Sequence, residues 1–131
     1  MPRLSKFIVV VYVLFNLTIA YDVIVAPAQL DATYLGGTMT PTREFLWFSI
    51  GSFHLFVAAV SLMTLWIRQA RERRWIVLAN AGFYAWDATT QWLYWGDRVG
   101  LASADLHVNA GVSAACAALL VAAAWRDDGE A

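Results

Sequence analysis

The residues best suited to proton chemistry lie deep inside long apolar runs of this sequence. His54 lies about 15 Å and Asp87 about 13 Å into their runs, at the rise of roughly 1.5 Å per residue of an α-helix. Asn16 lies at a similar depth in a third run. A histidine beside a carboxylate in a low-dielectric site can transfer protons, because the carboxylate fixes the imidazole tautomer. We therefore predict that Asp87 and His54 are an acid/base pair.

Five polar residues around Asp87 share one helical face. Their spacing of four, three, four and three residues aligns them along a helix. They are Asn80, Tyr84, Asp87, Gln91 and Tyr94. Ionisable groups inside a membrane are costly, so this face is expected to point toward neighbouring helices. A structural alternative stays open, in which Asn16, His54 and Asp87 only hydrogen-bond the helices together.

Four apolar stretches of about 20 residues position these side chains, at residues 7–26, 45–67, 75–95 and 106–125. This length spans about 30 Å of hydrocarbon as a helix, which satisfies its own backbone hydrogen bonds. Thr40 before Pro41 is typical of a helix start. We predict helices at about 5–26, 41–68, 74–96 and 104–126. The expected fold is all-α, an integral membrane four-helix bundle forming one transmembrane domain over residues 1–131.

Composition and charge favour a membrane location. The chain of 131 residues is 60% hydrophobic and 15% charged, against roughly a quarter charged in soluble domains. Seven Lys and Arg residues fall on one side of the predicted spans and two on the other, which places both termini in the cytoplasm. The seven are Arg3, Lys6, Arg68, Arg71, Arg73, Arg74 and Arg126, and the two are Arg43 and Arg98. High alanine and arginine content suggests a bacterial source, hence a multi-pass protein of the bacterial inner membrane.

Further residues near the predicted pocket are expected to contact a substrate. Aromatic rings among them could stack on it or stabilise a developing cation. The predicted substrate-binding residues are Asn16, Asp22, Glu44, Asn80, Tyr84, Trp86, Gln91, Trp92 and Tyr94. His54 and His107 differ by about 10 Å along the membrane normal, so a shared haem or metal is disfavoured. We expect no cofactor and no metal, and the net charge of −1 gives no reason to expect nucleic acid.

Several short runs in the first half of the chain carry a family resemblance. They are Ala20-Tyr21-Asp22, Ala26-Pro27, Leu35-Gly36, Phe45-Leu46-Trp47 and Gly51. With these runs the chain resembles small bacterial four-helix membrane proteins of the DoxX-like kind. The resemblance covers mostly the first two predicted helices. It implies the four-span topology and supplies no catalytic residues.

Three functions fit these features. The first is a cofactor-independent acid/base enzyme, an isomerase or cyclase of a lipophilic isoprenoid, sterol-like or quinone-like substrate. The alternative is a non-enzymatic accessory or lipophile-binding subunit of a larger membrane complex. A proton or ion pathway is weaker, because few polar residues continue into the cytoplasmic half. Expected partners are membrane lipid, a lipophilic small molecule and, through the alanine-rich helix at 104–126, a second copy of the chain.

Overall fold

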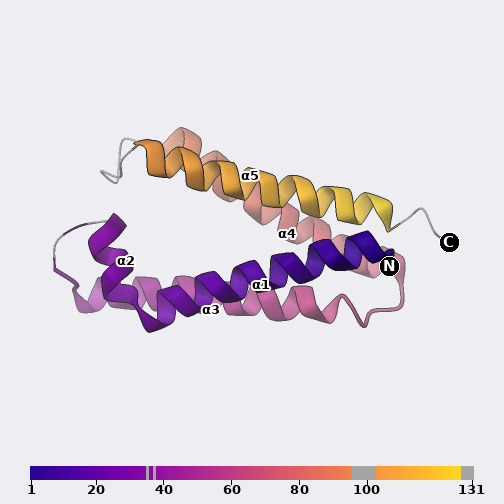
Figure 1. The fold of residues 1–131 in the computed structure, drawn as a ribbon, viewed down its shortest axis with the longest axis horizontal. Coiled ribbons are helices and arrows are strands. Elements are labelled where there is room, and N and C mark those ends of the chain that lie inside the picture. The colour runs from indigo at the N-terminus through magenta and orange to yellow at the C-terminus, as the bar shows by residue number, and fades with distance from the viewer. Residues whose placement is uncertain (35, 37, 96–102, 128–131) are drawn as a thin grey trace.

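The computed structural model describes residues 1–34, 36, 38–95 and 103–127, and the elements in these ranges are helices. Four of them are long: α1 (Arg3–Val25), α3 (Pro41–Met63), α4 (Ala70–Thr90) and α5 (Ser103–Arg126) (Figure 1). A short helix, α2 (Pro27–Tyr34), follows α1, and one π-helical turn, η1 (Gln91–Trp95), extends α4. The all-α prediction is thus confirmed for the described residues.

Three helical segments are long and apolar enough to cross a membrane: α1, α3 and the part of α5 at His107–Arg126. Helix α4 is not among them, since its first turns carry Arg71, Glu72, Arg73 and Arg74. The prediction of apolar segments long enough to cross a membrane is therefore supported for three of the four long helices.

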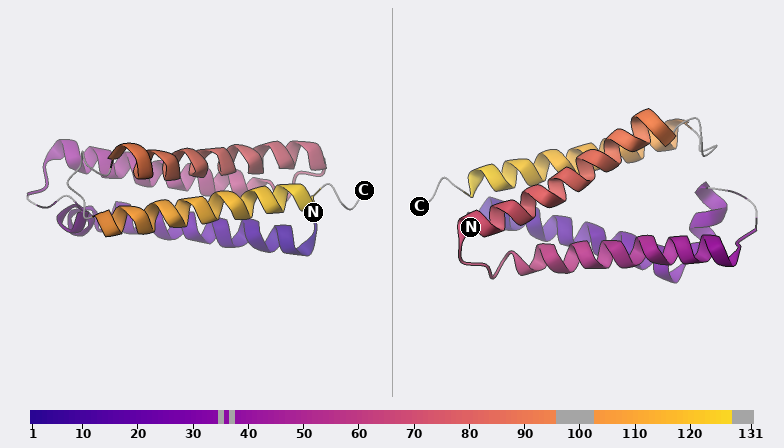
Figure 2. Two further views of the ribbon diagram at one scale, coloured as in Figure 1. Left: turned by 90° about the horizontal axis from the view of Figure 1, so that it is seen from above. Right: turned by 180° about the vertical axis from the view of Figure 1, so that it is seen from behind.

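The long helices form two antiparallel pairs. Helix α1 packs along α3, α4 packs along α5, and α1 also contacts α5, whereas α3 and α4 touch much less. The N-terminus and the end of α5 lie together, and the two pairs diverge toward the opposite end of the molecule (Figures 1 and 2). Helix α2 lies at that diverging end, on the α1–α3 side (Figure 1).

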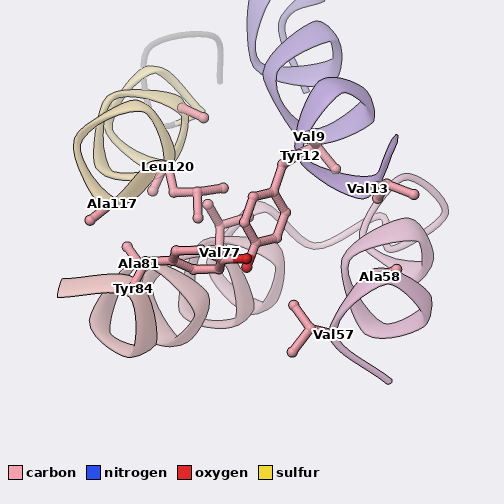
Figure 3. Packing of buried hydrophobic residues seen from close by; sticks show 12 residues of the cluster. Val9, Tyr12, Val13, Val57, Ala58, Val77, Ala81, Tyr84, Ala117 and Leu120 are labelled. Atoms are coloured by element: carbon pink, nitrogen blue, oxygen red, sulfur yellow. The ribbon is translucent and has the colours of Figure 1, made fainter. Parts of the chain in front are cut away.

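Small and branched apolar side chains make up the core. A Cβ atom at Gly51 would lie 2.6 Å from Cγ1 of Ile24, so only glycine allows α1 and α3 to approach this closely. The buried cluster contributed by the four long helices includes Val9, Tyr12, Val13, Val57, Ala58, Val77, Ala81, Tyr84, Ala117 and Leu120 (Figure 3). Many larger apolar side chains point outward instead, among them Phe7, Phe45, Phe56 and Trp86, each more than 60% exposed.

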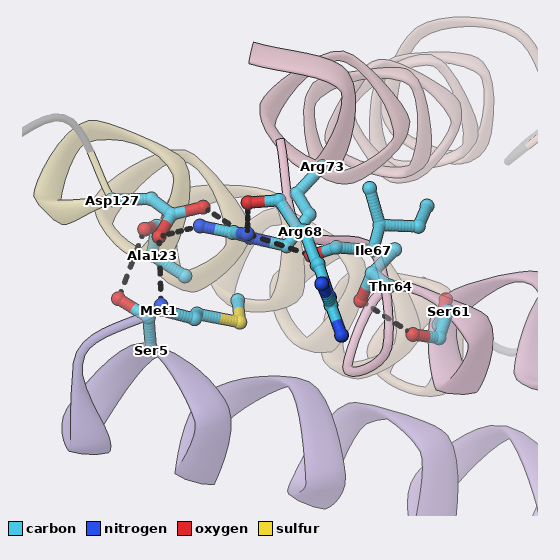
Figure 4. A network of polar contacts seen from close by, with 9 residues as sticks. All are labelled: Met1, Ser5, Ser61, Thr64, Ile67, Arg68, Arg73, Ala123 and Asp127. Atoms are coloured by element: carbon cyan, nitrogen blue, oxygen red, sulfur yellow. Dashed lines mark hydrogen bonds and ion pairs between the residues drawn. The ribbon is translucent and has the colours of Figure 1, made fainter. Parts of the chain in front are cut away.

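A buried ion pair fastens the end where the termini lie. Arg73 of α4 donates from Nε and Nη2 to the Asp127 carboxylate at 2.9 and 3.0 Å (Figure 4). Its Nη1 donates to the carbonyls of Ile67 and Arg68 at 2.7 Å, in the connection between α3 and α4. Ser5 of α1 donates to the Ala123 carbonyl of α5 at 3.0 Å. Helices α1, α4 and α5 and the connection between α3 and α4 are therefore joined at this end.

A second buried carboxylate holds α2 against α3. Asp31 is 1% exposed, and its Oδ1 accepts from Trp47 Nε1 and from Arg43 Nε, each at 2.9 Å. The Arg43 guanidinium also donates to the carbonyls of Gly36 and Thr38. Gly36 has a φ of 62°, a left-handed conformation that favours glycine. These contacts fix the turn between α2 and α3.

Element boundaries differ from the predicted ones at the α3–α4 connection. Helix α3 was expected to run to residue 68 and ends at Met63, where the Thr64 hydroxyl donates to the Ser61 carbonyl at 2.6 Å. Helix α4 was expected from residue 74 and begins at Ala70, so three of the arginines expected in a loop lie in its first turn. Helix α2 was not predicted at all.

Candidate functional site

Asn16 is the centre of a polar cluster that joins α1, α3 and α4. Its side chain is fully buried, and Nδ2 donates to the Tyr12 carbonyl one turn earlier in α1, at 2.9 Å. The amide oxygen faces two other helices. It accepts from the Tyr84 hydroxyl of α4 at 2.9 Å and lies 2.8 Å from Nδ1 of His54 in α3. One amide group therefore connects α1, α3 and α4. It joins Asn16 to His54, which the sequence predicted to lie at a similar depth in their apolar runs.

The Asn16 amide fixes the tautomer of His54. Only the NH2 group can donate to a carbonyl, so the contact with the Tyr12 carbonyl identifies the other atom as the oxygen. That oxygen can only accept, so His54 Nδ1 must carry the proton in this contact. In the neutral ring Nε2 then keeps its lone pair, and it has no hydrogen-bond partner among the described residues. The half-buried His54 is therefore arranged as a base through Nε2.

Asp87 belongs to a neighbouring group, one turn along α4 from Tyr84. Its Oδ2 accepts from Gln91 Nε2 at 2.7 Å and from the Ser113 hydroxyl of α5 at 2.6 Å. Asp87 and His54 share no hydrogen bond in the described part of the chain. The π-helical turn η1 begins at Gln91, four residues after Asp87. Turns of this kind are rare in proteins, and those that occur often lie at functional sites.

The polar face predicted on the third span is confirmed by its contacts. Asn80 donates to the Ser61 hydroxyl of α3 at 2.8 Å, Tyr84 reaches α1, and Asp87 reaches α5. Gln91 lies on this face as well, since its side-chain amide donates a hydrogen bond to the Asp87 carboxylate. The Tyr94 side chain lies outside the described residues. The face therefore points toward three neighbouring helices.

Four other predicted substrate-binding residues are placed away from this cluster. Asp22 and Glu44 are exposed, and Glu44 borders a shallow groove along α3 with Pro41, Phe45, Phe48, Ser49 and Ser52. Trp86 is 68% exposed and Trp92 is 60% exposed. The Trp92 ring packs against His107 with centroids 4.9 Å apart. Within the described ranges, no hydrogen bond joins these four residues to the side chains of Asn16, His54 or Asp87.

Sequence reasoning missed two members of the site. Tyr12 is 4% exposed, and its hydroxyl is buried with no hydrogen-bond partner. Its position one turn before Asn16, on the same helical face, was the available signal. Ser113 is hidden in an alanine-rich run, where nothing distinguishes it from a small packing residue. Among the described residues no group of three or more His, Cys, Asp or Glu side chains is arranged to hold a metal ion.

Comparison with known proteins gives no family for this chain. No protein-family model, no curated protein and no solved structure matches it. The DoxX-like resemblance stays a prediction, and the function has to be argued from the geometry of the site.

Proposed function

We propose that the chain is a four-helix bundle that spans a bacterial inner membrane four times, with both termini in the cytoplasm. Large exposed apolar side chains cover the outward faces of the helices, as expected where the surrounding solvent is lipid. The fourth span is the part of α4 after Arg74 together with η1, a continuous helical stretch at residues 75–95. That stretch is about long enough to cross roughly 30 Å of hydrocarbon.

Charge placement supports this orientation. Arg68, Arg71 and Arg126 are exposed at the end where the termini lie. At the opposite end, the Arg43 charge is compensated by the buried Asp31 carboxylate. An excess of exposed arginine on one side is the pattern that places that side in the cytoplasm.

Cysteine labelling tests the orientation. Cys116 is first replaced by alanine, and single cysteines are then introduced at Thr38, before α3, or at Gln69, between α3 and α4. Both positions are exposed. In intact cells or spheroplasts, a membrane-impermeant maleimide is expected to label Thr38→Cys and to label Gln69→Cys only after permeabilisation. The reverse pattern would show that the orientation is inverted.

We further propose that the protein is an acid/base enzyme of the isomerase or cyclase type, acting on a lipophilic substrate. The observation that carries this proposal is the His54 imidazole, whose Nδ1 proton is held by Asn16 while Nε2 is left without a partner among the described residues. A base held in one tautomer within a low-dielectric site is suited to removing a proton from carbon. Asp87, held by Gln91 and Ser113, would stabilise the charged imidazolium or return the proton.

The alternative, a non-enzymatic accessory or lipophile-binding subunit, is favoured by one observation. Asn16, Asn80 and Asp87 each hydrogen-bond to another helix, which is also how polar residues hold membrane helices together. In this case the site would bind a lipophile without changing it. An assay of proton transfer to carbon separates the two functions.

Solvent deuterium incorporation tests the enzyme without requiring a known substrate. The protein in nanodiscs is incubated in D2O with a lipid extract of its host membrane, and the lipophiles are analysed by mass spectrometry. One compound or class is expected to gain deuterium. His54→Ala should slow this at least about 100-fold, the usual minimum for loss of a general base. Asp87→Asn should also slow it, whereas Glu72→Gln, at an exposed carboxylate of α4, should not.

Two results would contradict the enzymatic proposal. One is a lipophile that binds and gains no deuterium with the folded protein. The other is full exchange by Asp87→Asn and His54→Ala together. Either result would leave the lipophile-binding subunit as the better account.

A further inference from the structure

Aromatic rings surround the polar cluster on its α3 and α4 sides. Phe83 packs against Phe53 with ring centroids 4.7 Å apart, and against Tyr84 at 5.2 Å and a right angle. Phe53 also meets the His54 ring at 6.2 Å, and Phe15 of α1 lies 6.5 Å from Tyr84. Phe15 and Phe83 are partly buried, and Phe53 is 40% exposed. The polar cluster therefore has a partly open wall of rings, against which a flat molecule can stack.

Beside this wall of rings, the Tyr12 hydroxyl is a buried donor without a hydrogen-bond partner among the residues that the structure describes. Its ring meets Tyr84 edge to face at 5.4 Å, in the centre of the packed residues (Figure 3). The other donors of the cluster are already used: Asn16 Nδ2 on the Tyr12 carbonyl, and Tyr84 and His54 on the Asn16 oxygen. A buried donor without an acceptor is unfavourable. The Tyr12 hydroxyl therefore needs an acceptor that its present contacts do not supply.

We propose that this site binds a planar lipophile bearing a conjugated carbonyl, a quinone or an unsaturated ketone, and that Tyr12 donates its hydroxyl hydrogen bond to the carbonyl oxygen. This inference rests on the proposed function, because it names the substrate class for the same site. A carbonyl supplies the missing acceptor and adds no donor of its own. Flat conjugated rings match the aromatic wall better than a saturated chain does.

The same ligand chemistry suits the free nitrogen of His54. A carbonyl makes the neighbouring C–H bonds acidic, and the enolate formed by proton loss carries its charge on the oxygen that Tyr12 contacts. His54 Nε2 takes the proton from one carbon and returns it to the conjugated carbon, so the double bond moves and the net charge is unchanged. The step needs no oxidant or reductant. Because the Tyr12 hydroxyl is enclosed, the side chains around it must move when the ligand enters.

A pair of matched probes tests the carbonyl contact. Menadione has two carbonyl groups, and 2-methylnaphthalene has a similar flat shape and no acceptor. In nanodiscs, corrected for partition into empty nanodiscs, wild-type protein is expected to bind menadione about tenfold more tightly, the effect of one hydrogen bond worth roughly 1.4 kcal/mol. The infrared carbonyl stretch of bound menadione should move to lower frequency, as expected for a hydrogen-bonded carbonyl.

Tyr12→Phe removes only the hydroxyl and should abolish both the preference for menadione and the infrared shift. Tyr21→Phe, at a tyrosine of α1 that is 65% exposed, is the matched control and should change neither. Equal affinity of the two probes for wild-type protein would overturn the proposal without any variant. A preference that survives in Tyr12→Phe would overturn it as well.

Failure of this inference can be told apart from failure of the proposed enzyme. If menadione is preferred and no lipophile gains deuterium, the carbonyl site stands and the catalytic proposal fails. If a lipophile gains deuterium and the probes bind equally, the enzyme stands and the carbonyl assignment fails.

Discussion

Replacing Asp127 with alanine is expected to lower the free energy of unfolding by about 3–5 kcal/mol, because it leaves a buried arginine without its counter-ion. Arg73 is 7% exposed and Asp127 is 6% exposed, and two hydrogen bonds join them. The two carbonyl contacts of Arg73 cannot neutralise the charge. Unfolding by SDS in mixed micelles, followed by tryptophan fluorescence, measures the loss.

Two further variants show whether the unpaired charge is the cause. Arg71→Met, at an exposed arginine of the same helical turn, should change stability by less than about 0.5 kcal/mol. The double variant Arg73→Met with Asp127→Leu should recover part of the stability, because apolar residues of similar size can replace a buried ion pair. The recovery is not complete, since the Met1 amino group, 3.7 Å from the Asp127 carboxylate, also loses its partner. A double variant as unstable as Asp127→Ala would show that packing, rather than charge, decides the effect.

Asn16→Leu is expected to cost about 2–4 kcal/mol, because two buried donors lose one shared acceptor at a cost of roughly 1–3 kcal/mol each. These donors are the Tyr84 hydroxyl and His54 Nδ1. Interhelical hydrogen bonds in membranes average only about 0.6 kcal/mol, so we expect a loss of stability in the lower part of this range. The same SDS unfolding assay measures it.

Thr18→Val is the matched control for Asn16→Leu. The Thr18 hydroxyl is exposed and bonds only to the Leu14 carbonyl of its own helix. It should alter stability by no more than about 0.5 kcal/mol. Nitrogen-15 NMR of His54 adds an independent readout, since the Nδ1–H tautomer should dominate in the wild type and lose its preference in Asn16→Leu. An unchanged tautomer would contradict the role given to Asn16.

The helices and the polar face could be predicted because both depend on local spacing. Thr40 does cap α3 and accepts a hydrogen bond from the Arg43 backbone N–H, as the Thr-Pro start indicated. The spacing of Asn80, Tyr84 and Asp87 placed them on one face, and each contacts another helix. Neither result required knowledge of which helices pair.

The missed features depend on contacts between distant positions. Arg73 is one of four arginines within seven residues, and no pattern in the sequence shows that it turns inward to a carboxylate 54 residues away. Asp31 lies in a short segment of only eight helical residues, with no long apolar run to mark it. Trp86 was expected to stack on a substrate or to stabilise a developing cation, but its place on the helix turns it outward, where it is 68% exposed. The residue type alone does not show which way the side chain points.

The end-to-end asymmetry of the molecule has a consequence for how a guest molecule is exchanged. Polar contacts join α1, α4, α5 and the connection between α3 and α4 where the N-terminus and the end of α5 lie, and the pairs diverge at the opposite end. The two pairs can therefore move apart most easily about the tied end, by small rotations of rigid bodies. If the proposed lipophile binds between the pairs, we expect it to enter and leave at the diverging end, and therefore from one leaflet of the membrane.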